Sequence, residues 1–279
     1  MFQKKSTDML EGSPLWSMVF FAMPMIIGNL FQQFYNMADS AIVGKFVSEN
    51  ALAAVGASYS LTNVFICIAI GGGVGSSVLT SQYLGSRDYG SMKTSVYTAL
   101  TSFFAVSVVL AVFGVSASPA IMVWLRTPAN IFAEAVLYLR IYFVGLPFLF
   151  MYNVLASVFN ALGKSKIPLY FLIFSSILNV IMDLFMVMVM HMGVAGVALA
   201  TIIAQGISAV ISFFVLVRYL KGQPEQGVLF DGEMLGRMVK IALPSILQQS
   251  IVSIGMMLVQ SVVNSFGSAA LAGYSAGIR

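Results

Sequence analysis

Two carboxylic acids stand inside long apolar stretches of the sequence, and they are the residues whose chemistry most needs an explanation. Asp39 lies within residues 16–43 and Asp183 within residues 167–190, whereas the other eight acidic residues lie in loops, in tails or near the ends of such stretches. A charge at the centre of a bilayer costs about 2.5–3.5 kcal/mol on insertion scales, so it normally faces a cavity or a partner. Both acids are therefore candidates for binding a cation.

Spacing along the helices predicts that these acids share one depth. Asp39 comes five residues before Gly44, which is about 7–8 Å at a rise of roughly 1.5 Å per residue. Asp183 comes seven residues before Met190, about 10 Å from the same end at the same rise, and Thr201 lies at a similar depth on the next apolar stretch. These groups can converge on one polar pocket.

Other polar residues accompany the acids on neighbouring turns. Asn179 and Asp183 are four residues apart and share one helix face, while Tyr35 and Asn36 precede Asp39 by a single turn. Two interpretations compete: a hydrogen-bond network that holds helices together, and a cation site. The cation site is favoured because two carboxylates are costly as a purely structural contact. A shielded carboxyl pair can take up a proton, and oxygen ligands equally suit sodium.

Composition places these residues in a membrane. Of 279 residues, 59% are hydrophobic and only 9% are charged, against about 25% charged in soluble domains. Such a chain is an all-α polytopic membrane protein surrounded by lipid, which excludes soluble enzymes, disordered chains, coiled coils and disulfide scaffolds. The single cysteine, Cys67, forms no internal disulfide. The basic residues are scattered in short loops, so we expect no nucleic-acid partner.

Hydropathy predicts the membrane spans. Six complete apolar segments cover approximately residues 16–43, 52–83, 94–117, 136–160, 167–190 and 195–218, a seventh runs from about 238 to 266, and an eighth begins near Ala269. The stretch 118–135 is expected to include a short interfacial helix. The polar residues 1–14 show no cleavable signal pattern and are predicted to form a cytoplasmic tail.

The distribution of Lys and Arg predicts the sidedness. With the N-terminus inside, the external segments hold only Lys45 and Arg126. The cytoplasmic segments then hold ten basic residues: Lys4, Lys5, Arg87, Lys93, Lys164, Lys166, Arg218, Lys221, Arg237 and Lys240. This bias predicts a multi-pass protein of the plasma (inner) membrane with a cytoplasmic N-terminus.

An internal repeat predicts the domain organisation. At a shift of 220 residues, Ala22, Pro24 and Ile26 align with Ala242, Pro244 and Ile246. Six spans separate the copies, so both enter from the same side, as parallel repeats do in transporters. We expect a six-helix lobe at 15–221, a cytoplasmic linker at 222–236, and at 237–279 the first one to two helices of a second lobe, cut short from a fold of about twelve helices.

Several segments resemble the multidrug and toxic compound extrusion (MATE) transporters. They include FAMPMIIGNLFQQFYNMADSAIVGKF, GGGVGSSVLTSQYLGSRD and ILNVIMDLFMVMVMHMGVAGVALATIIAQ, in the order and spacing typical of that family. The resemblance implies two six-helix lobes around a cleft. It also implies a cation site to which Asp39, Asn179, Asp183 and Thr201 correspond, with sodium or a proton as the coupling ion and no other cofactor. The seventh segment carries Gln248 and Gln249 and no carboxylate, which favours coupling through the first lobe.

The resemblance implies a secondary active antiporter, not an enzyme, that exports organic, often cationic, xenobiotics and acts as a monomer when complete. A flippase for lipid-linked precursors is the alternative, and a two-aspartate intramembrane enzyme is a third hypothesis. Pro24 can kink the first span, either as a static bend or as a flexing point during transport. Gly71 and Gly75, four residues apart, predict close helix packing and no nucleotide loop.

Overall fold

The protein is all-helical throughout the part of the chain that the computed structural model describes, which comprises residues 14–47, 49–125, 127 and 129–265. The helices are α1 (Pro14–Ile42), η1 (Val43–Val47), α2 (Glu49–Gly85), α3 (Tyr89–Trp124), α4 (Phe132–Ala161), α5 (Lys166–Leu184), η2 (Phe185–Val189), α6 (Gly193–Lys221) and α7 (Gly232–Ser265), where η1 and η2 are π-helical turns. The predicted tail up to residue 13 and the eighth segment from Ala269 lie outside the described residues.

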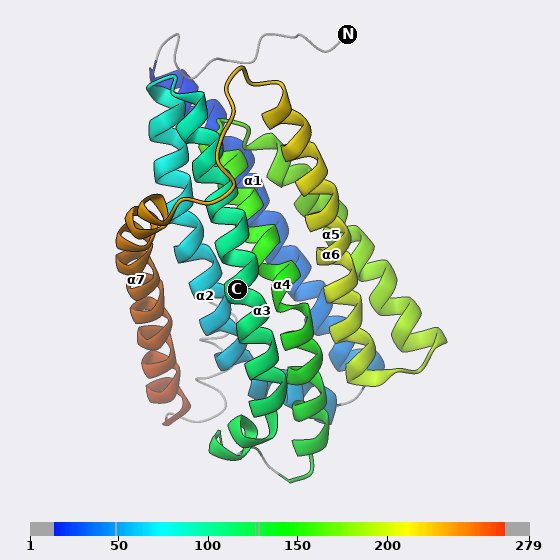
Figure 1. Ribbon diagram of the computed structural model, residues 1–279. Coiled ribbons are helices and arrows are strands. Elements are labelled where there is room, and N and C mark those ends of the chain that lie inside the picture. The colour runs from blue at the N-terminus through cyan, green and yellow to red at the C-terminus, as the bar shows by residue number, and fades with distance from the viewer. Residues whose placement is uncertain (1–13, 48, 126, 128, 266–279) are drawn as a thin grey trace.

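The membrane character predicted from hydropathy is confirmed. Six helices of the described chain are long and apolar enough to cross a bilayer, and they coincide with the six predicted spans: α1 to α6. The seventh predicted segment is also helical, although α7 begins at Gly232 and thus six residues earlier than expected. In Figure 1 α1 and α7 run in the same direction, from the upper part of the view downward.

The expectation of a separate interfacial helix within 118–135 is wrong for the described residues. Ser118 to Trp124 continues α3, whose backbone ends at a cap on Leu125, and α4 begins at Phe132. Pro119 lies inside α3 and has no N–H to donate to the preceding turn. The sequence pattern shows the proline, but it does not show that the helix continues past it for five more residues before the polar loop begins.

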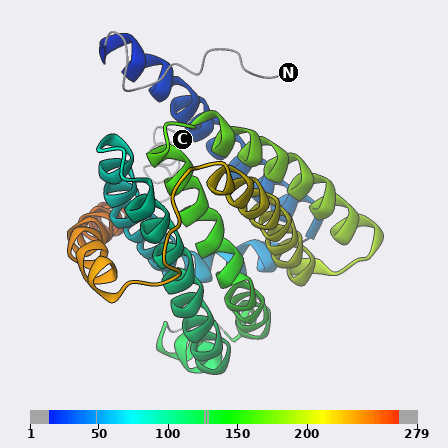
Figure 2. The same ribbon diagram turned by 45° about the horizontal axis from the view of Figure 1, so that its top comes forward.

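Helix α4 is the centre of the bundle. It packs against α2, α3 and α6, and more lightly against α5, while α1 packs chiefly on α5. In Figures 1 and 2 α5 and α6 lie on one side of α4 and α7 lies on the opposite side, next to α2. The bundle therefore holds α1, α5 and α6 together as one group around the predicted cation-site residues.

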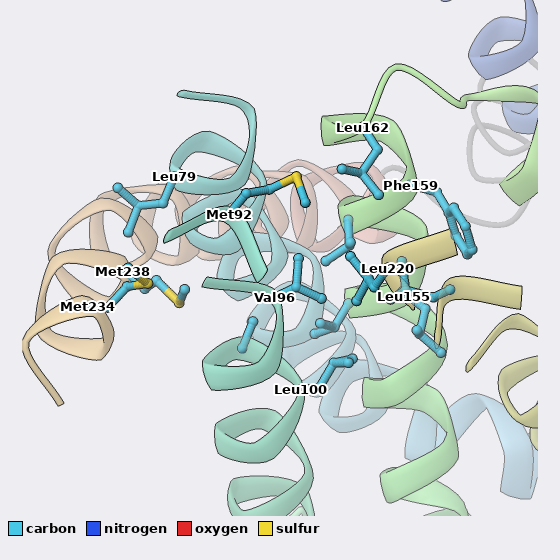
Figure 3. Close-up of a cluster of buried hydrophobic side chains, with 14 residues drawn as sticks. Leu79, Met92, Val96, Leu100, Leu155, Phe159, Leu162, Leu220, Met234 and Met238 are labelled. Atoms are coloured by element: carbon cyan, nitrogen blue, oxygen red, sulfur yellow. The ribbon is translucent and has the colours of Figure 1, made fainter. Parts of the chain in front are cut away.

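A buried apolar cluster ties five helices together near the ends that carry most of the basic residues (Figure 3). It joins Leu79 of α2, Met92 of α3, Phe159 of α4, Leu220 of α6 and Met234 of α7, each at most 8% exposed. Side chains packed this closely lose contacts when any one of them is truncated, because the interior relaxes only in part. The start of α7 is thereby built into the core of the preceding helices.

Hydroxyl groups inside the helices are mostly satisfied within their own helix. Ser76 donates to the carbonyl of Gly73 at 2.9 Å, Ser107 to that of Phe104 at 2.7 Å, and Ser118 to that of Gly114 at 2.6 Å. Such bonds let a polar side chain reside in an apolar helix at little cost, since no partner from another helix is needed. Other polar side chains bond across helices; among them are the hydroxyls of Thr80 on α2 and Ser95 on α3, which lie 3.1 Å apart, and the residues of the site described next.

Candidate cation-binding site

Asn179 joins α5 to α6 through a part-buried polar contact. In the orientation that satisfies its hydrogen bonds, the amide donates from Nδ2 to Oδ2 of Asp183 over 2.9 Å and accepts at Oδ1 from the Thr201 hydroxyl over 3.2 Å. The Thr201 hydroxyl also lies 3.1 Å from the carbonyl oxygen of Val197. Asn179 is 2% exposed and Asp183 is 0% exposed. Three of the predicted site residues are thus brought together as one connected group.

Asp39 lies in the last turn of α1, three residues before its last residue, and η1 follows directly. Its side chain lies outside the described residues, so its predicted proximity to Asp183 stays a prediction. The backbone supports that prediction, because α1 packs on α5 and the two π-helical turns η1 and η2 contact each other. Asp183 itself stands one residue before the end of α5.

Both acidic residues therefore stand just before a π-helical turn. Such turns are rare, and they occur frequently at functional sites because the extra residue redirects side chains and frees a carbonyl oxygen. Sequence periodicity did not predict either turn. One physical signal precedes them: each follows an aspartate within an otherwise apolar helix, at VGKFV and FMVMV.

The supporting residues that we predicted have different surroundings. Tyr35 lines a small cavity together with Asn179 and Thr201. Asn36 is exposed, and its Oδ1 accepts from Nε2 of Gln32 over 3.3 Å. Pro24 is buried inside α1, and the Ser165 hydroxyl donates to the carbonyl of nearby Phe21 over 3.0 Å. The turn of α1 that precedes Pro24 is thereby attached to the residue that caps α5.

The small cavity holds about 30 Å³ and lies between α1, α4, α5 and α6. A cavity needs at least about 10–15 Å³ for one water molecule, so this one can hold water or a small ion. Its lining adds residues that sequence reasoning missed: Gln32, Tyr152, Ser175, Ser176 and Gln205. A spacing of four could have revealed several of them, since Ser175, Asn179 and Asp183 form one stripe on α5 and Thr201 and Gln205 form another on α6.

Carboxylate, amide and hydroxyl oxygens are hard ligands, which suit sodium, and a carboxyl group also accepts a proton. Because Asp183 is shielded from water, its charge has to be balanced within the protein. An ion in the cavity meets the Asn179 and Thr201 side chains that line it, and the Asp183 carboxylate is joined to the cavity through its hydrogen bond with the Asn179 amide.

A larger hollow of about 830 Å³ opens at the end of the bundle near Arg87 and Lys164. Its wall is formed mainly by α1, α2 and α4, and includes Phe21, Val74 and Asn160. This volume lies within the range of about 300–1,000 Å³ typical of sites for drug-sized ligands.

Outside the spans, the Asp88 carboxylate caps the N-terminus of α3. It accepts a hydrogen bond from the backbone N–H of Ser91, and this bond lowers the pKa of Asp88 below its ordinary value.

The two glycines predicted to pack closely do so, and their partner is α7. A methyl group placed on Gly71 would lie 2.8 Å from the backbone Cα of Ile246, and one on Gly75 would lie 2.5 Å from the carbonyl oxygen of Met238. Side-chain contacts continue this interface, because the amide of Asn63 donates to the hydroxyl of Ser253 over 3.1 Å. The stripe on α2 serves helix packing, which confirms that interpretation of the glycines.

Comparison with known proteins gives a consistent match. The MatE family model matches residues 24–185. The probable multidrug resistance protein YpnP of Bacillus subtilis is 30% identical over 98% of this chain and 61% of its own length, and the multidrug export protein MepA of Staphylococcus aureus is 24% identical over 96% of this chain and 60% of its own length. The chain thus spans about three fifths of the curated relatives it matches.

Solved structures show the same fold. A MATE protein in the straight conformation superimposes with a TM-score of 0.88 at 24% identity, over 98% of this chain and 62% of the other. An outward-facing multidrug resistance MATE family transporter superimposes with a TM-score of 0.84 at 24% identity, over 96% of this chain and 60% of the other. Helices α1 to α7 therefore have the same arrangement as the matching part of those chains, which is about three fifths of their length.

Proposed function

Because the chain belongs to the MatE family, we propose that it forms the cation-coupled part of an antiporter that exports drug-like organic compounds in exchange for protons or sodium. The names of two relatives, a probable multidrug resistance protein and a multidrug export protein, support drug export over the flippase alternative. The observation that carries the coupling role is the fully buried Asp183, held by Asn179 beside the Thr201 hydroxyl.

In this proposal the inward-moving cation binds among Asp39, Asn179, Asp183 and Thr201. Binding neutralises buried negative charge, and the protein can then favour one of two helix arrangements, as a ligand shifts any two-state equilibrium by its differential affinity. One elementary charge that crosses 100 mV supplies about 2.3 kcal/mol, which corresponds to roughly fiftyfold accumulation of an exported compound.

The membrane setting follows from the six apolar helices. We propose a plasma (inner) membrane location with the N-terminus in the cytoplasm, because the ends of the helices near α6–α7 carry Arg218, Lys221, Arg237 and Lys240. In this scheme the chain is completed by a second lobe, works as a monomer, and uses no cofactor besides the coupling ion. Its repeat boundaries, 15–221 and 237–279, belong to the same proposal.

Separate ion gradients test the antiport. In vesicles that contain the full-length protein, we expect efflux of a fluorescent organic cation to follow an inward gradient of protons or of sodium, each varied while the other is held at zero. Efflux has to stop when both gradients are collapsed, because no other energy source is present. Undiminished uphill efflux without either gradient would contradict the proposal.

Removal of the Thr201 hydroxyl tests the site's ligand set. In Thr201→Val the side chain keeps its shape, but Asn179 loses a hydrogen-bond partner. We expect the cation concentration that gives half-maximal efflux to rise about tenfold, which corresponds to a loss of about 1.4 kcal/mol of cation-binding free energy. The matched control is Ser208→Ala on the same helix, because the buried Ser208 hydroxyl has no hydrogen-bond partner. An equal shift in both variants would contradict a specific role for Thr201.

A further inference from the structure

The segment that joins α6 to α7 crosses the outside of α3. Figure 1 shows it running from the end of α6 over the bundle to α7, and the contacts below place it on the first turns of α3. We name residues 223–231 the strap. A linker between two mobile halves would be expected to make few contacts, yet the strap makes a regular series of them.

Lys93 is the first contact. This lysine is only 7% exposed, and its ammonium group donates to the carbonyl oxygen of Gln223 over 3.0 Å and to that of Glu225. An ammonium group has three donors and is costly to bury unless they are used. Two carbonyl oxygens of the strap accept from two of these three donors, so the buried charge of Lys93 depends on the strap being in place.

Two threonines continue the series along α3. The Thr94 hydroxyl accepts from the backbone N–H of Val228 over 3.0 Å while it donates to the carbonyl of Gly90 over 2.9 Å. The Thr98 hydroxyl, about one turn further along, accepts from the backbone N–H of Asp231 over 3.0 Å. The strap thus uses its own backbone groups to pair with side chains of α3.

Close packing against the same turns of α3 also fixes the strap. A methyl group on Gly227 would lie 2.6 Å from Cβ of Lys93 and 2.8 Å from the backbone nitrogen of Thr94, so only glycine fits there. The Glu225 carboxylate accepts from the backbone N–H of Gly90 in the first turn of α3, where a negative charge also suits the helix dipole.

The end of the strap is the start of α7. The Asp231 carboxylate accepts from the backbone N–H of Met234 over 2.9 Å and so caps α7. Met234 and Met238 then enter the apolar cluster beside Leu79 and Met92 (Figure 3). The entrance to α7 is therefore fixed both by hydrogen bonds to α3 and by burial in the common core.

We propose that the strap is a permanently docked element held by Lys93, and that it anchors the first turns of α7 to the first lobe throughout transport. Relative movement of a second lobe then arises beyond the start of α7 and not by swinging on residues 223–231. The docking stands on the contacts alone. Its persistence during transport rests on the proposed function, so the two parts are tested by different measurements.

Proteolysis tests the docking. In the full-length protein in detergent, we expect a glutamyl endopeptidase to cut at Glu225 slowly, and about tenfold faster in Lys93→Met, because loss of charge-assisted hydrogen bonds raises the open population. Lys240→Met, at an exposed lysine of α7, is the control, and the protease should cut this variant at the same rate as the original protein. Equal rates in the original protein and Lys93→Met would overturn the role of Lys93.

A disulfide separates local release from misfolding. In a Cys67→Ala background, the pair Thr94→Cys and Val228→Cys is introduced to cross-link the strap to α3 on oxidation, because the Val228 nitrogen lies 3.0 Å from the Thr94 hydroxyl, and loss of free thiols verifies that the disulfide has closed. When combined with Lys93→Met, the closed disulfide should restore slow cutting at Glu225. Fast cutting despite the closed disulfide would mean that the substitution unfolds the bundle, and the assignment to Lys93 would be wrong.

The same cysteine pair tests whether the strap stays docked during transport. With Lys93 retained, we expect efflux in the oxidised state to remain within about twofold of efflux in the reduced state, which is a small change on the free-energy scale. Efflux that stops on oxidation and returns with a reductant would show that the strap must detach, and would overturn the proposal. If efflux is absent in both states and also in the Cys67→Ala background, the proposed function is contradicted instead. In that case the proteolysis experiment by itself still tests whether the strap is docked.

Discussion

Replacement of Asp183 by Asn is expected to reduce cation-driven efflux by at least about tenfold, to near the rate of vesicles without the protein, because the substitution removes the one acidic group that α5 offers to an ion. Asparagine has nearly the same shape as aspartate, and its carbonyl oxygen can still accept from the Asn179 amide. The fold should therefore survive while coupling is lost. Efflux from energised vesicles at a series of proton and sodium gradients measures the effect.

The control for this substitution is Glu134→Gln, at an exposed acid in the first turn of α4. It removes the same charge from a position open to solvent, so efflux and its ion dependence should be unchanged. Asp39→Asn should resemble Asp183→Asn if the two acids act on one ion. An Asp183→Asn protein that exports at the normal rate with the normal ion dependence would contradict the coupling role, and the network would then be only structural.

Substitution of Gly75 by Leu is expected to separate α7 from α2 and to destabilise the protein by about 1–3 kcal/mol, the usual cost of overpacking a tight interface. A Cβ atom at Gly75 would lie 2.5 Å from the carbonyl oxygen of Met238. A backbone oxygen cannot turn aside as a flexible side chain can, so the whole helix has to move. Thermal unfolding in detergent measures the loss, and, in a Cys67→Ala background that removes the thiol next to Ser253, an Asn63→Cys, Ser253→Cys pair should cross-link less readily.

Gly85→Leu supplies the comparison, because it adds the same side chain to the same helix at a position with no atom within 4 Å. Its unfolding temperature and cross-linking should match those of the original protein. If Gly75→Leu also left both unchanged, α7 would not be packed on α2 through these glycines, and the fixed entrance of α7 that the strap proposal requires would lose its second support.

The amino-acid sequence alone predicts most of the helices of this protein, for a simple physical reason. In lipid, each backbone polar group must be paired inside its own helix, so every long apolar run is forced into a helix that crosses the bilayer. That rule placed α1 to α6 to within a few residues at most ends, and the four-residue spacing of Asn179 and Asp183 correctly placed both on one face. The expected break after residue 117 was wrong, because α3 continues past Pro119, a residue that usually ends a helix in water.

What the sequence determined, then, is the set of helices, their membrane character and the polar residues that had to be hidden within them, since these depend on solvation and on periods of 3.6 residues. Only the tertiary structure decided which helices are neighbours. It joined Asn179 to Thr201, placed the glycines of α2 against α7, and laid the strap on Lys93. Such pairings depend on the fit of surfaces distant in the chain, and no local pattern encodes which surfaces will meet.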